Sequence, residues 1–288
     1  MRRPSVSAVS TFEIRRGADR ARTRTEWLDS AHSFAFGPHY DPDNTGFGLL
    51  VAHNCDVLQP GPGYPVHAHR DIEILTWVVA GTLAHSERDG TPTVIPAGQL
   101  HYLSAGSGIR HTEFSADDQP VQVVQMWLTP DEFGLPPTSC LLQPGDRLAS
   151  GELVEVASGA AAGQDGVLRI RQRAAALSVA RLPAGATMPL PAARYLHVYL
   201  TAGSGTFETG DGQVLGVLAA GDALRITGDD DALRITDDAL RITGDAVRIT
   251  GHADLGPAVV RAAEPAELLV WRMQAGIGAT AGQSTYPG

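Results

Sequence analysis

The sequence predicts an all-β protein built from two related β-barrels in tandem. Many short apolar runs have the length and composition of strands, and Gly, Pro and other turn residues bound most of them. Long stretches with 3.6-residue periodicity, which would indicate helices, are missing. The 288 residues, of which 43% are hydrophobic, are enough for two domains of ordinary size with buried cores.

The strand-like runs follow one another along the whole chain. The clearest are 11–16, 46–58, 72–85, 91–98, 121–130, 166–182, 194–209 and 266–273. Both halves read as strand, Gly turn, strand, Gly turn, strand, which indicates two barrels of one kind. The Pro- and Gly-rich segment 134–151 marks a seam between them. The sequence therefore predicts a first domain over 10–140, a linker over 141–160 and a second domain over 161–275.

One segment of the second domain repeats a five-residue unit, ALRIT or a close variant. The copies stand at 223–227, 232–236, 239–243 and 246–250. Leu or Val alternates with Ile in each copy, so these side chains would share one face of a strand. The two-residue links between the last copies would allow a small meander of hairpins. We favour a tandem duplication over 223–250, in which one copy is a barrel strand and the extra copies form a mobile loop.

Composition and charge argue against several classes of protein. The formal net charge of −10 argues against a general nucleic-acid or anionic-membrane binder. The two cysteines, Cys55 and Cys140, make neither a disulfide framework nor a zinc motif. The N-terminal residues lack the apolar core of a signal peptide, and no apolar run is long enough to span a bilayer. We therefore expect a cytoplasmic, soluble protein that is a monomer.

Histidines carry the strongest chemical signal in the chain. His67 and His69 stand two positions apart at the start of an apolar run. On a strand, both would point to the same face, roughly 6–7 Å apart. His111 and Glu113 repeat this spacing. Two such pairs on different strands can converge on one ion, and three imidazoles with a carboxylate suit a divalent transition metal with open positions.

A rival ligand set is also compatible with the sequence. The stretch GPGYPVHAHRDIE fits the first cupin motif, and PAGQLH fits the second. That match would make Glu73 and His101 metal ligands together with His67 and His69. A straight strand puts Glu73 about 13 Å from His69, so the rival set requires a bend or bulge that the first set does not need.

The chain resembles the pirin-like bicupins, a family that includes bacterial proteins with quercetin 2,3-dioxygenase activity. The resemblance covers most of residues 10–140. It rests on WLDSAHSFAFGPHYDP at 27–42, PVHAHRDIEILTWVVAGTLAH at 65–85, AGQLHYLSAGSGIRHTEF at 97–114 and VQVVQMWLTP at 121–130. It implies that both barrels are cupins, that is, double-stranded β-helix or jelly-roll barrels.

The resemblance also implies a set of metal ligands. In that family the ligands lie in the His-x-His and in the later His-x-Glu, which are His67, His69, His111 and Glu113 here. The position of His101 is usually not a ligand, so His101 becomes a candidate to support a ligand from behind.

Two more residues lie close to these motifs. We expect Glu73 to hydrogen-bond to a ligand or to Arg70, because metal-bound histidines usually have a carboxylate or carbonyl behind them. His85 matches a histidine that recurs in the family, in the hairpin after the first motif. The aspartate that usually follows it is replaced here, so no role is predicted for His85.

The second half lacks the corresponding metal-binding motif. Counting from Gly185 as from Gly61, the His-x-His positions fall on Pro191 and Ala193, and neither side chain can bind a metal. His197 stands alone on an apolar run, which is typical of a core histidine. The second cupin is therefore expected to be a degenerate one without metal.

The resemblance implies an enzyme, a metal-dependent flavonol (quercetin) 2,3-dioxygenase. Its cofactor would be one divalent transition metal, Fe(II) in the first place, with Mn, Ni, Cu or Zn as alternatives. Glu113 would accept the proton of the flavonol 3-hydroxyl, and dioxygen would add across the ring with release of carbon monoxide. One alternative is a non-enzymatic, metal-binding regulator that acts through a partner protein. Another is a bicupin whose metal only stabilises the fold.

Overall fold

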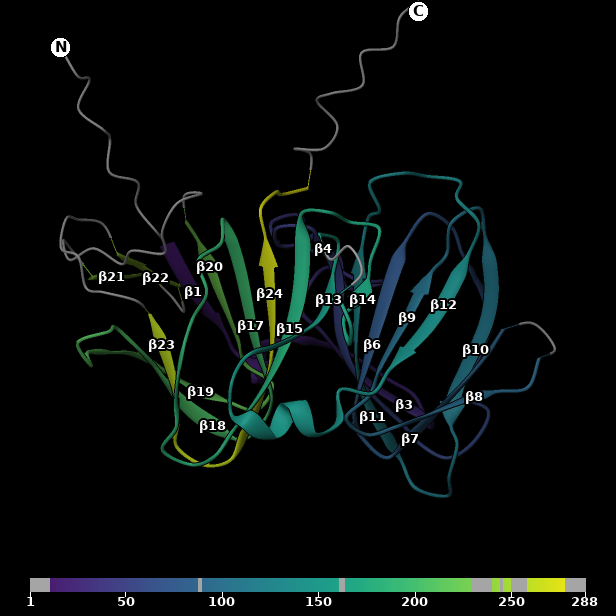
Figure 1. Cartoon of the computed structure of the whole chain (residues 1–288), viewed down its shortest axis with the longest axis horizontal. Coiled ribbons are helices and arrows are strands. Elements are labelled where there is room, and N and C mark those ends of the chain that lie inside the picture. The colour runs from purple at the N-terminus through teal and green to yellow at the C-terminus, as the bar shows by residue number, and fades with distance from the viewer. Residues whose placement is uncertain are drawn as a thin grey trace, which may run out of the picture. The chain divides into compact units, whose positions relative to one another are not determined.

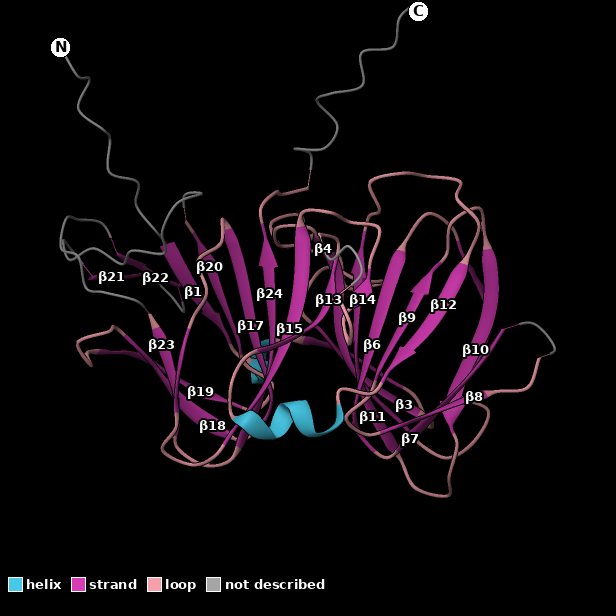
Figure 2. Cartoon of the chain, viewed as in Figure 1, coloured by secondary structure: helices cyan, strands magenta, loops and turns pink. Residues whose placement is uncertain are grey.

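The computed structural model describes residues 11–87, 90–160, 164–228, 240–243, 246–249 and 258–277. Strands make up 55% of it and helices only 4%, in agreement with a fold of two cupin barrels. The predicted fold class is therefore confirmed. The helices η1 (Gly17–Asp19) and η2 (Gly145–Ser150) are short 3₁₀ segments among the strands (Figures 1 and 2). Among the described residues, no helix has the length and apolar character that a membrane span requires.

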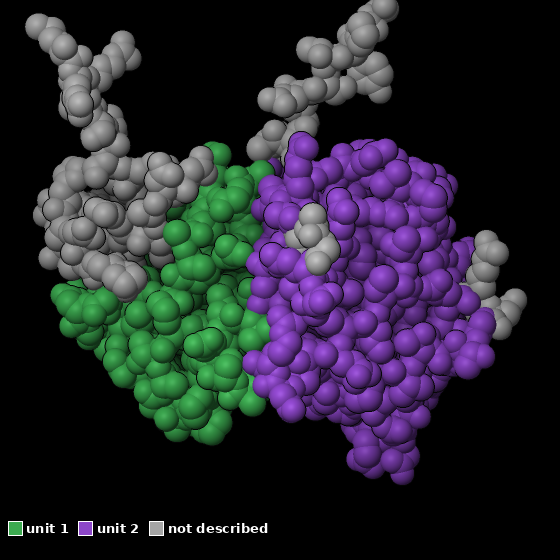
Figure 3. Space-filling view, in the orientation of Figure 1, with its two compact units in different colours: residues 1–19, 148–154, 177–275 green, residues 20–147, 155–176, 276–288 purple. Residues whose placement is uncertain are grey.

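The chain forms two compact units, which Figure 3 shows in different colours. Unit 2 comprises residues 20–147, 155–176 and 276–288, and unit 1 comprises residues 1–19, 148–154 and 177–275.

Unit 2 contains two antiparallel sheets. A seven-stranded sheet has the order β12-β9-β6-β11-β4-β3-β2, and a four-stranded sheet has the order β5-β10-β7-β8. The strands are β2 (Ala21–Arg24), β3 (Leu28–His32), β4 (Leu50–Leu58), β5 (Tyr64–His69), β6 (Glu73–Ala80), β7 (Thr82–Glu87), β8 (Thr93–Pro96), β9 (Leu100–Ser104), β10 (Ile109–Ser115), β11 (Val121–Leu128) and β12 (Thr138–Leu142). A short parallel pair, β13 (Val154–Ser158) with β14 (Leu168–Arg169), follows them in sequence.

The core of unit 2 lies where residues of the two sheets are buried together. Leu28, Leu58 and Val78 of the larger sheet cluster with Leu83 and Ile95 of the smaller one. Burying each such side chain contributes about 1.5–3 kcal/mol. The apolar packing therefore holds the smaller sheet against the larger one. The smaller sheet carries His67, His69 and His111.

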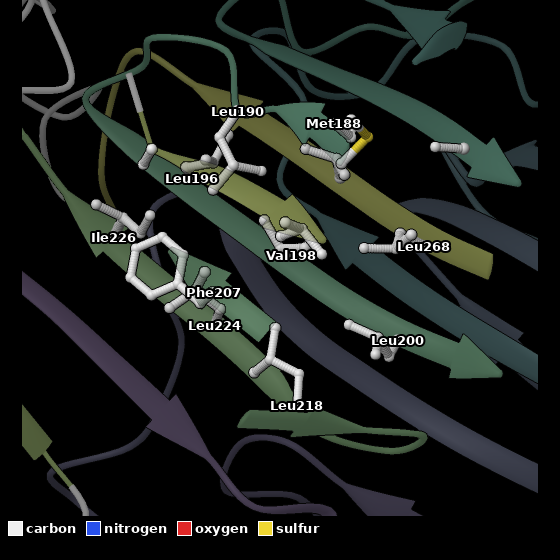
Figure 4. Close-up of a cluster of buried hydrophobic side chains, with 14 of the residues drawn as sticks. Met188, Leu190, Leu196, Val198, Leu200, Phe207, Leu218, Leu224, Ile226 and Leu268 are labelled. Carbon is white, nitrogen blue, oxygen red and sulfur yellow. The ribbon is translucent and has the colours of Figure 1, made fainter. Parts of the chain in front are cut away.

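Unit 1 repeats this arrangement of a larger and a smaller sheet. The larger sheet contains, in order, β1-β20-β17-β24-β15, and the smaller one has the order β16-β23-β18-β19. The strands are β1 (Thr11–Arg15), β15 (Ala175–Leu182), β16 (Thr187–Pro189), β17 (Tyr195–Ala202), β18 (Ser204–Glu208), β19 (Val214–Ala219), β20 (Ala223–Thr227), β23 (Val259–Ala262) and β24 (Ala266–Met273). Figure 4 shows its apolar interior, in which Met188, Val198 and Phe207 are labelled.

The boundaries of the units differ from the predicted domains at 10–140, 141–160 and 161–275. Strand β1 belongs to unit 1, where it pairs with β20 and buries Phe12 and Ile14 in the core. The segment expected to be a linker contains η2 and β13. Alternation of apolar residues identifies a strand, but the pairing partner of β1 lies more than 200 residues away and leaves no local signal.

The repeated unit has two structural roles. Its first copy is β20, which lies between β1 and β17 in the larger sheet of unit 1. The third and fourth copies contain β21 (Leu240–Thr243) and β22 (Ala246–Ile249), which form an antiparallel pair in which Arg241 and Arg248 are opposite. The second copy lies outside the described residues. The repeat thus combines both sequence interpretations, a barrel strand and a hairpin.

Candidate metal centre

Strands β5 and β10 bring three of the predicted ligands together. They are antiparallel neighbours, with His67 opposite His111 and His69 opposite Ile109. The ring centroids of His67 and His111 are 4.3 Å apart, and those of His69 and His111 are 5.1 Å apart. One nitrogen from each of the three rings lies within 4.8 Å of the others. Strand alternation therefore places the His-x-His pair on one face, opposite a histidine of the next strand.

The hydrogen bonds of the three rings leave one nitrogen of each available. His67 donates from Nδ1 to the Pro65 carbonyl at 2.9 Å, which leaves the lone pair of Nε2 free. The Nε2 atoms of His69 and His111 are buried and have no hydrogen-bond partner among the described residues. A buried polar nitrogen without a partner is costly, and a metal ion is one group that removes this cost. The donor set therefore fits a divalent transition metal.

Burial keeps His69 and His111 neutral. Burial first, and the neighbouring His67 second, lower the pKa of His69 to about 4 and the pKa of His111 to about 2. A neutral imidazole is the form that binds a metal, because its ring nitrogen then keeps a lone pair. His69 and His111 can therefore bind a metal at neutral pH without first losing protons.

Glu113 lies on the same strand as His111 but outside the group of three nitrogens. The side-chain amide of Gln125 donates to both of its carboxylate oxygens, at 3.2 and 3.0 Å. Trp127 Nε1 donates to the side-chain oxygen Oε1 of Gln125 at 3.0 Å, which fixes the orientation of that amide. Burial raises the pKa of Glu113 to about 7, the Gln125 bond opposes this rise, and the charge of Asp56 adds to it.

Strand β5 carries a bulge opposite Glu113, while β10 itself is regular. The register between β10 and β5 shifts between His111 and Glu113, so that Glu113 is opposite Tyr64, whereas β10 pairs with β7 without a shift. Gly63, with φ +62°, lies so close to β10 that a Cβ atom there would be 2.1 Å from the backbone carbonyl oxygen of Glu113. Only glycine allows this approach of the two backbones. Gly63 thus lets β5 and β10 approach each other at Glu113.

His85 contacts the cluster directly, although no role was predicted for it. Its Nε2 lies 2.8 Å from Nδ1 of His111. If Nε2 of His111 binds a metal, Nδ1 carries the proton and donates it to His85. The sequence held one usable signal, the match of His85 to a histidine that recurs in the family. The structure places His85 opposite Glu113 on the neighbouring strand β7, so the two residues share a face.

Within the described part of the chain, the ring of His101 contacts that of His85, which in turn contacts His111. The rings of His101 and His85 have centroids 4.3 Å apart, and His101 Nε2 lies 2.9 Å from the hydroxyl of Ser139. Burial lowers the pKa of His85 to about 4 and that of His101 to about 3. A supporting position for His101, behind His85 and His111, agrees with this geometry and stays a prediction.

Glu73 is hydrogen-bonded elsewhere than expected. Its carboxylate accepts bonds from the hydroxyls of Tyr102 and Ser104 and from the backbone N–H of Arg171, the last two at 2.6 and 2.8 Å. Neither the histidine cluster nor Arg70 provides these donors. The chain bends between β5 and β6, where Asp71 has φ +51°, and Glu73 begins β6 in the larger sheet. The rival ligand set required a bend that would bring Glu73 to the histidines. The bend at Asp71 instead brings Glu73 to Tyr102, Ser104 and Arg171.

A buried carboxylate that sequence reasoning missed lies beside the cluster. Asp56 accepts hydrogen bonds from Ser30 Oγ at 2.5 Å and from the Tyr64 hydroxyl at 3.1 Å. Burial raises the pKa of Asp56 to about 6, and the two donors oppose that rise. The ring centroid of Tyr64 is 6.0 Å from that of His67. Asp56 lies in β4, and the sequence of this strand gives no sign that the Asp56 side chain points inward.

Comparison with known proteins finds relatives that match most of the chain. The family model described as Pirin matches residues 15–128. A protein of Mycobacterium tuberculosis provisionally named a quercetin 2,3-dioxygenase is 42% identical over 274 residues, 95% of this chain and 99% of that protein. The quercetin 2,3-dioxygenase of Escherichia coli K12 is 39% identical over 125 residues, 43% of this chain and 54% of that enzyme.

A solved structure extends the similarity to the whole fold. It is the bacterial pirin YhhW of Escherichia coli in complex with nickel(II), with a TM-score of 0.72 and 26% identity, covering 92% of this chain and 99% of YhhW. The YhhW complex shows that a pirin of this fold binds a divalent metal. From the matching family model, the near-complete alignment with the mycobacterial relative and this structural similarity, we conclude that the chain belongs to the pirin family.

Proposed function

We propose that this chain is a metal-dependent dioxygenase that opens the central ring of a flavonol such as quercetin. The proposed ligands are His67, His69, His111 and Glu113, around one divalent transition metal. The observation that carries the proposal is the convergence of three histidine nitrogens within 4.8 Å, two of them buried and unpartnered in the described part of the chain. The quercetin 2,3-dioxygenase names of the relatives support the choice of substrate.

In this proposal the metal would supply Lewis acidity and one-electron redox chemistry. The residues of the chain orient the substrate and move its proton. Glu113 accepts the proton of the flavonol 3-hydroxyl, and its pKa of about 7 allows it to gain and release a proton near neutral pH. Gln125 keeps the carboxylate in place through its two hydrogen bonds.

The net reaction consumes one flavonol and one dioxygen molecule. Two carbon–carbon bonds of the central ring break, and the carbon between them leaves as carbon monoxide with its own hydroxyl oxygen. The two oxygen atoms of dioxygen go to the two flanking carbons, one of which becomes an ester carbonyl on the ring oxygen and the other a carboxylic acid. We propose iron(II) as the metal, with manganese, nickel, copper or zinc as alternatives. The nickel(II) complex of YhhW supports a divalent metal without favouring iron.

Three measurements on the full chain test this proposal. They are the metal content per chain, the absorbance change when quercetin is added without oxygen, and the loss of flavonol absorbance in air. Stoichiometric metal, saturable binding and turnover are the expected results. Stoichiometric metal without turnover would favour the regulatory alternative. If His111→Ala kept full metal while His101→Ala lost it, the proposed ligand set would be wrong.

A further inference from the structure

We propose that the candidate metal centre is built for substrates with an anionic group, which Arg70 and Arg110 recognise. This inference rests on the proposed function, because it names the class of substrate for the same site. The anionic group would be a sulfonate, sulfate or carboxylate on the part of an aromatic substrate that lies away from the metal. The two arginines and His69 line one groove, called the His69 groove here.

The His69 groove is large enough for such a substrate. Its volume is about 610 Å³, within the range of sites for small organic molecules. The lining includes His69, Arg70, Ser107 and Arg110, which join the cluster to the surrounding surface. The groove therefore adjoins the cluster at His69, and a ligand bound there would lie in the same groove as Arg70 and Arg110.

The charges in the groove are not balanced. Arg70 and Arg110 are exposed, and within the described ranges neither has an ion-pair partner. Among the described lining residues, Glu87 supplies the one carboxylate, so two positive charges face one negative charge there. Glu87 is opposite His111 on the neighbouring strand and shares its face. An anionic group on the substrate would supply the second negative charge.

The backbone, not an ion pair, sets the place of each arginine. Arg110 is opposite Ala68 in the β5–β10 ladder, one residue from the His69–Ile109 pair. Arg70 directly follows the end of β5, and its Nη2 would lie 3.6 Å from a Cβ atom on Gly108. Gly108 has φ +132°, so a larger residue there would be strained. Both guanidinium groups thus keep their hydrogen-bond donors for a ligand.

The guanidinium group suits this task. It is planar, stays charged at all relevant pH values, and can donate two parallel hydrogen bonds to a sulfonate or carboxylate. Ion pairs at exposed positions are individually weak, so two of them together should favour an anionic ligand by about tenfold over its neutral counterpart. The preference should shrink when salt is added, because salt screens exposed charges.

The test compares quercetin with a quercetin sulfonated on its catechol ring. Both ligands are titrated without oxygen into the full, metal-loaded chain, and turnover in air is measured separately. We expect the sulfonate to bind about tenfold more tightly at low salt. Arg70→Gln with Arg110→Gln should reduce this preference, the ratio of the two dissociation constants, to less than about threefold. The matched control is Arg24→Gln, an exposed arginine of β2 outside the groove, which should keep the preference.

A second variant should act in the opposite direction. Glu87→Gln removes the negative charge of the groove and should increase the preference for the sulfonate by about threefold. Equal affinity for the two ligands in the unmodified chain would overturn the inference, and so would a preference that survives the double Arg variant. Preference without turnover would support the inference and contradict the proposed function. Turnover without preference would do the reverse, and failure to bind either ligand would overturn both.

Discussion

The smaller sheets of the two units have the same strand arrangement, but the side chains at the corresponding positions differ in chemistry. In unit 2, β5 lies at the edge and pairs with β10, and there His67 is opposite His111. In unit 1, β16 lies at the edge and pairs with β23, and there Met188 is opposite Val260. Met188 and Val260 are buried and belong to an apolar cluster.

This difference shows that the sheet positions side chains without deciding their chemistry. The same ladder supports an interior filled by its own apolar atoms in one unit and an interior with unpartnered nitrogens in the other. Function in this fold therefore depends on a few residues placed on a common scaffold. That unit 1 binds no metal stays a prediction. Each of the following predictions tests one side of this comparison.

The largest effect is expected in the apolar interior of unit 1. Phe207 is fully buried, and its ring packs edge-on against that of Phe12 with centroids 5.0 Å apart. Phe207→Ala should lower the free energy of unfolding by about 3–5 kcal/mol, because it leaves a cavity. Urea unfolding measures this change. The metal content of the folded variant should stay the same, and its loss would show that the two interiors are not independent.

The next effect concerns the histidine cluster of unit 2. His111→Ala removes a nitrogen from the centre of the cluster and should weaken metal binding by at least about 100-fold, more than the loss of a supporting residue. Competition with a chelator measures the affinity. His101→Ala is the matched control, since His101 contacts His85 and lies outside the group of three nitrogens. A smaller loss in His111→Ala than in the control would contradict the prediction.

A pH effect should distinguish the polar interior from the apolar one. Burial raises the pKa of Asp56 from 3.8 to about 6, so between these values the folded state holds a proton that the unfolded state has released. The contribution of Asp56 to stability is therefore full below pH 3.8 and is lost as pH rises to about 6. The loss is about 1.4 kcal/mol per pH unit, or about 3 kcal/mol over the window.

Asp56→Asn isolates this contribution. The difference in unfolding free energy between the unmodified chain and Asp56→Asn should change across the window and be constant above it. Hydrogen exchange of the β4 amides, measured at several pH values, reports on unit 2 alone. A difference that does not vary with pH would rule out this role of Asp56.

The smallest effect is expected at His85, which accepts the Nδ1 proton of His111 when Nε2 faces a metal. His85→Phe keeps a ring of similar size but removes the acceptor. It should weaken metal binding by about 10–100-fold, the usual cost of losing a residue that orients a ligand. The absorption spectrum of the nickel(II)-loaded variant should also change. An unchanged affinity and spectrum would show that His85 only fills space.

The sequence predicted the strands of this fold well, because strand signals are local. The run at 266–273 is β24 without change, and the run at 121–130 contains β11. The sheet that β1 joins could not be predicted, since its partner β20 is distant in the sequence.

The candidate site was predictable to a similar extent. Alternation along strands brought His67, His69 and His111 together as expected. The hydrogen bonds of Glu113 to Gln125 had no local signal, and the partners of Glu73 depend on a bend at a residue with positive φ. Such features are decided by packing between sheets, which the order of residues does not show.

The membership of β1 in unit 1 has a consequence for synthesis on the ribosome. Phe12 and Ile14 leave the ribosome more than 200 residues before their partners Ile226 and Leu224. At about 5–20 residues per second, these apolar side chains wait for about 10–40 seconds without their sheet. Most of unit 2 can fold during this time. Until β20 arrives, the first strand is a segment that a chaperone could bind, and completion of unit 1 ends that exposure.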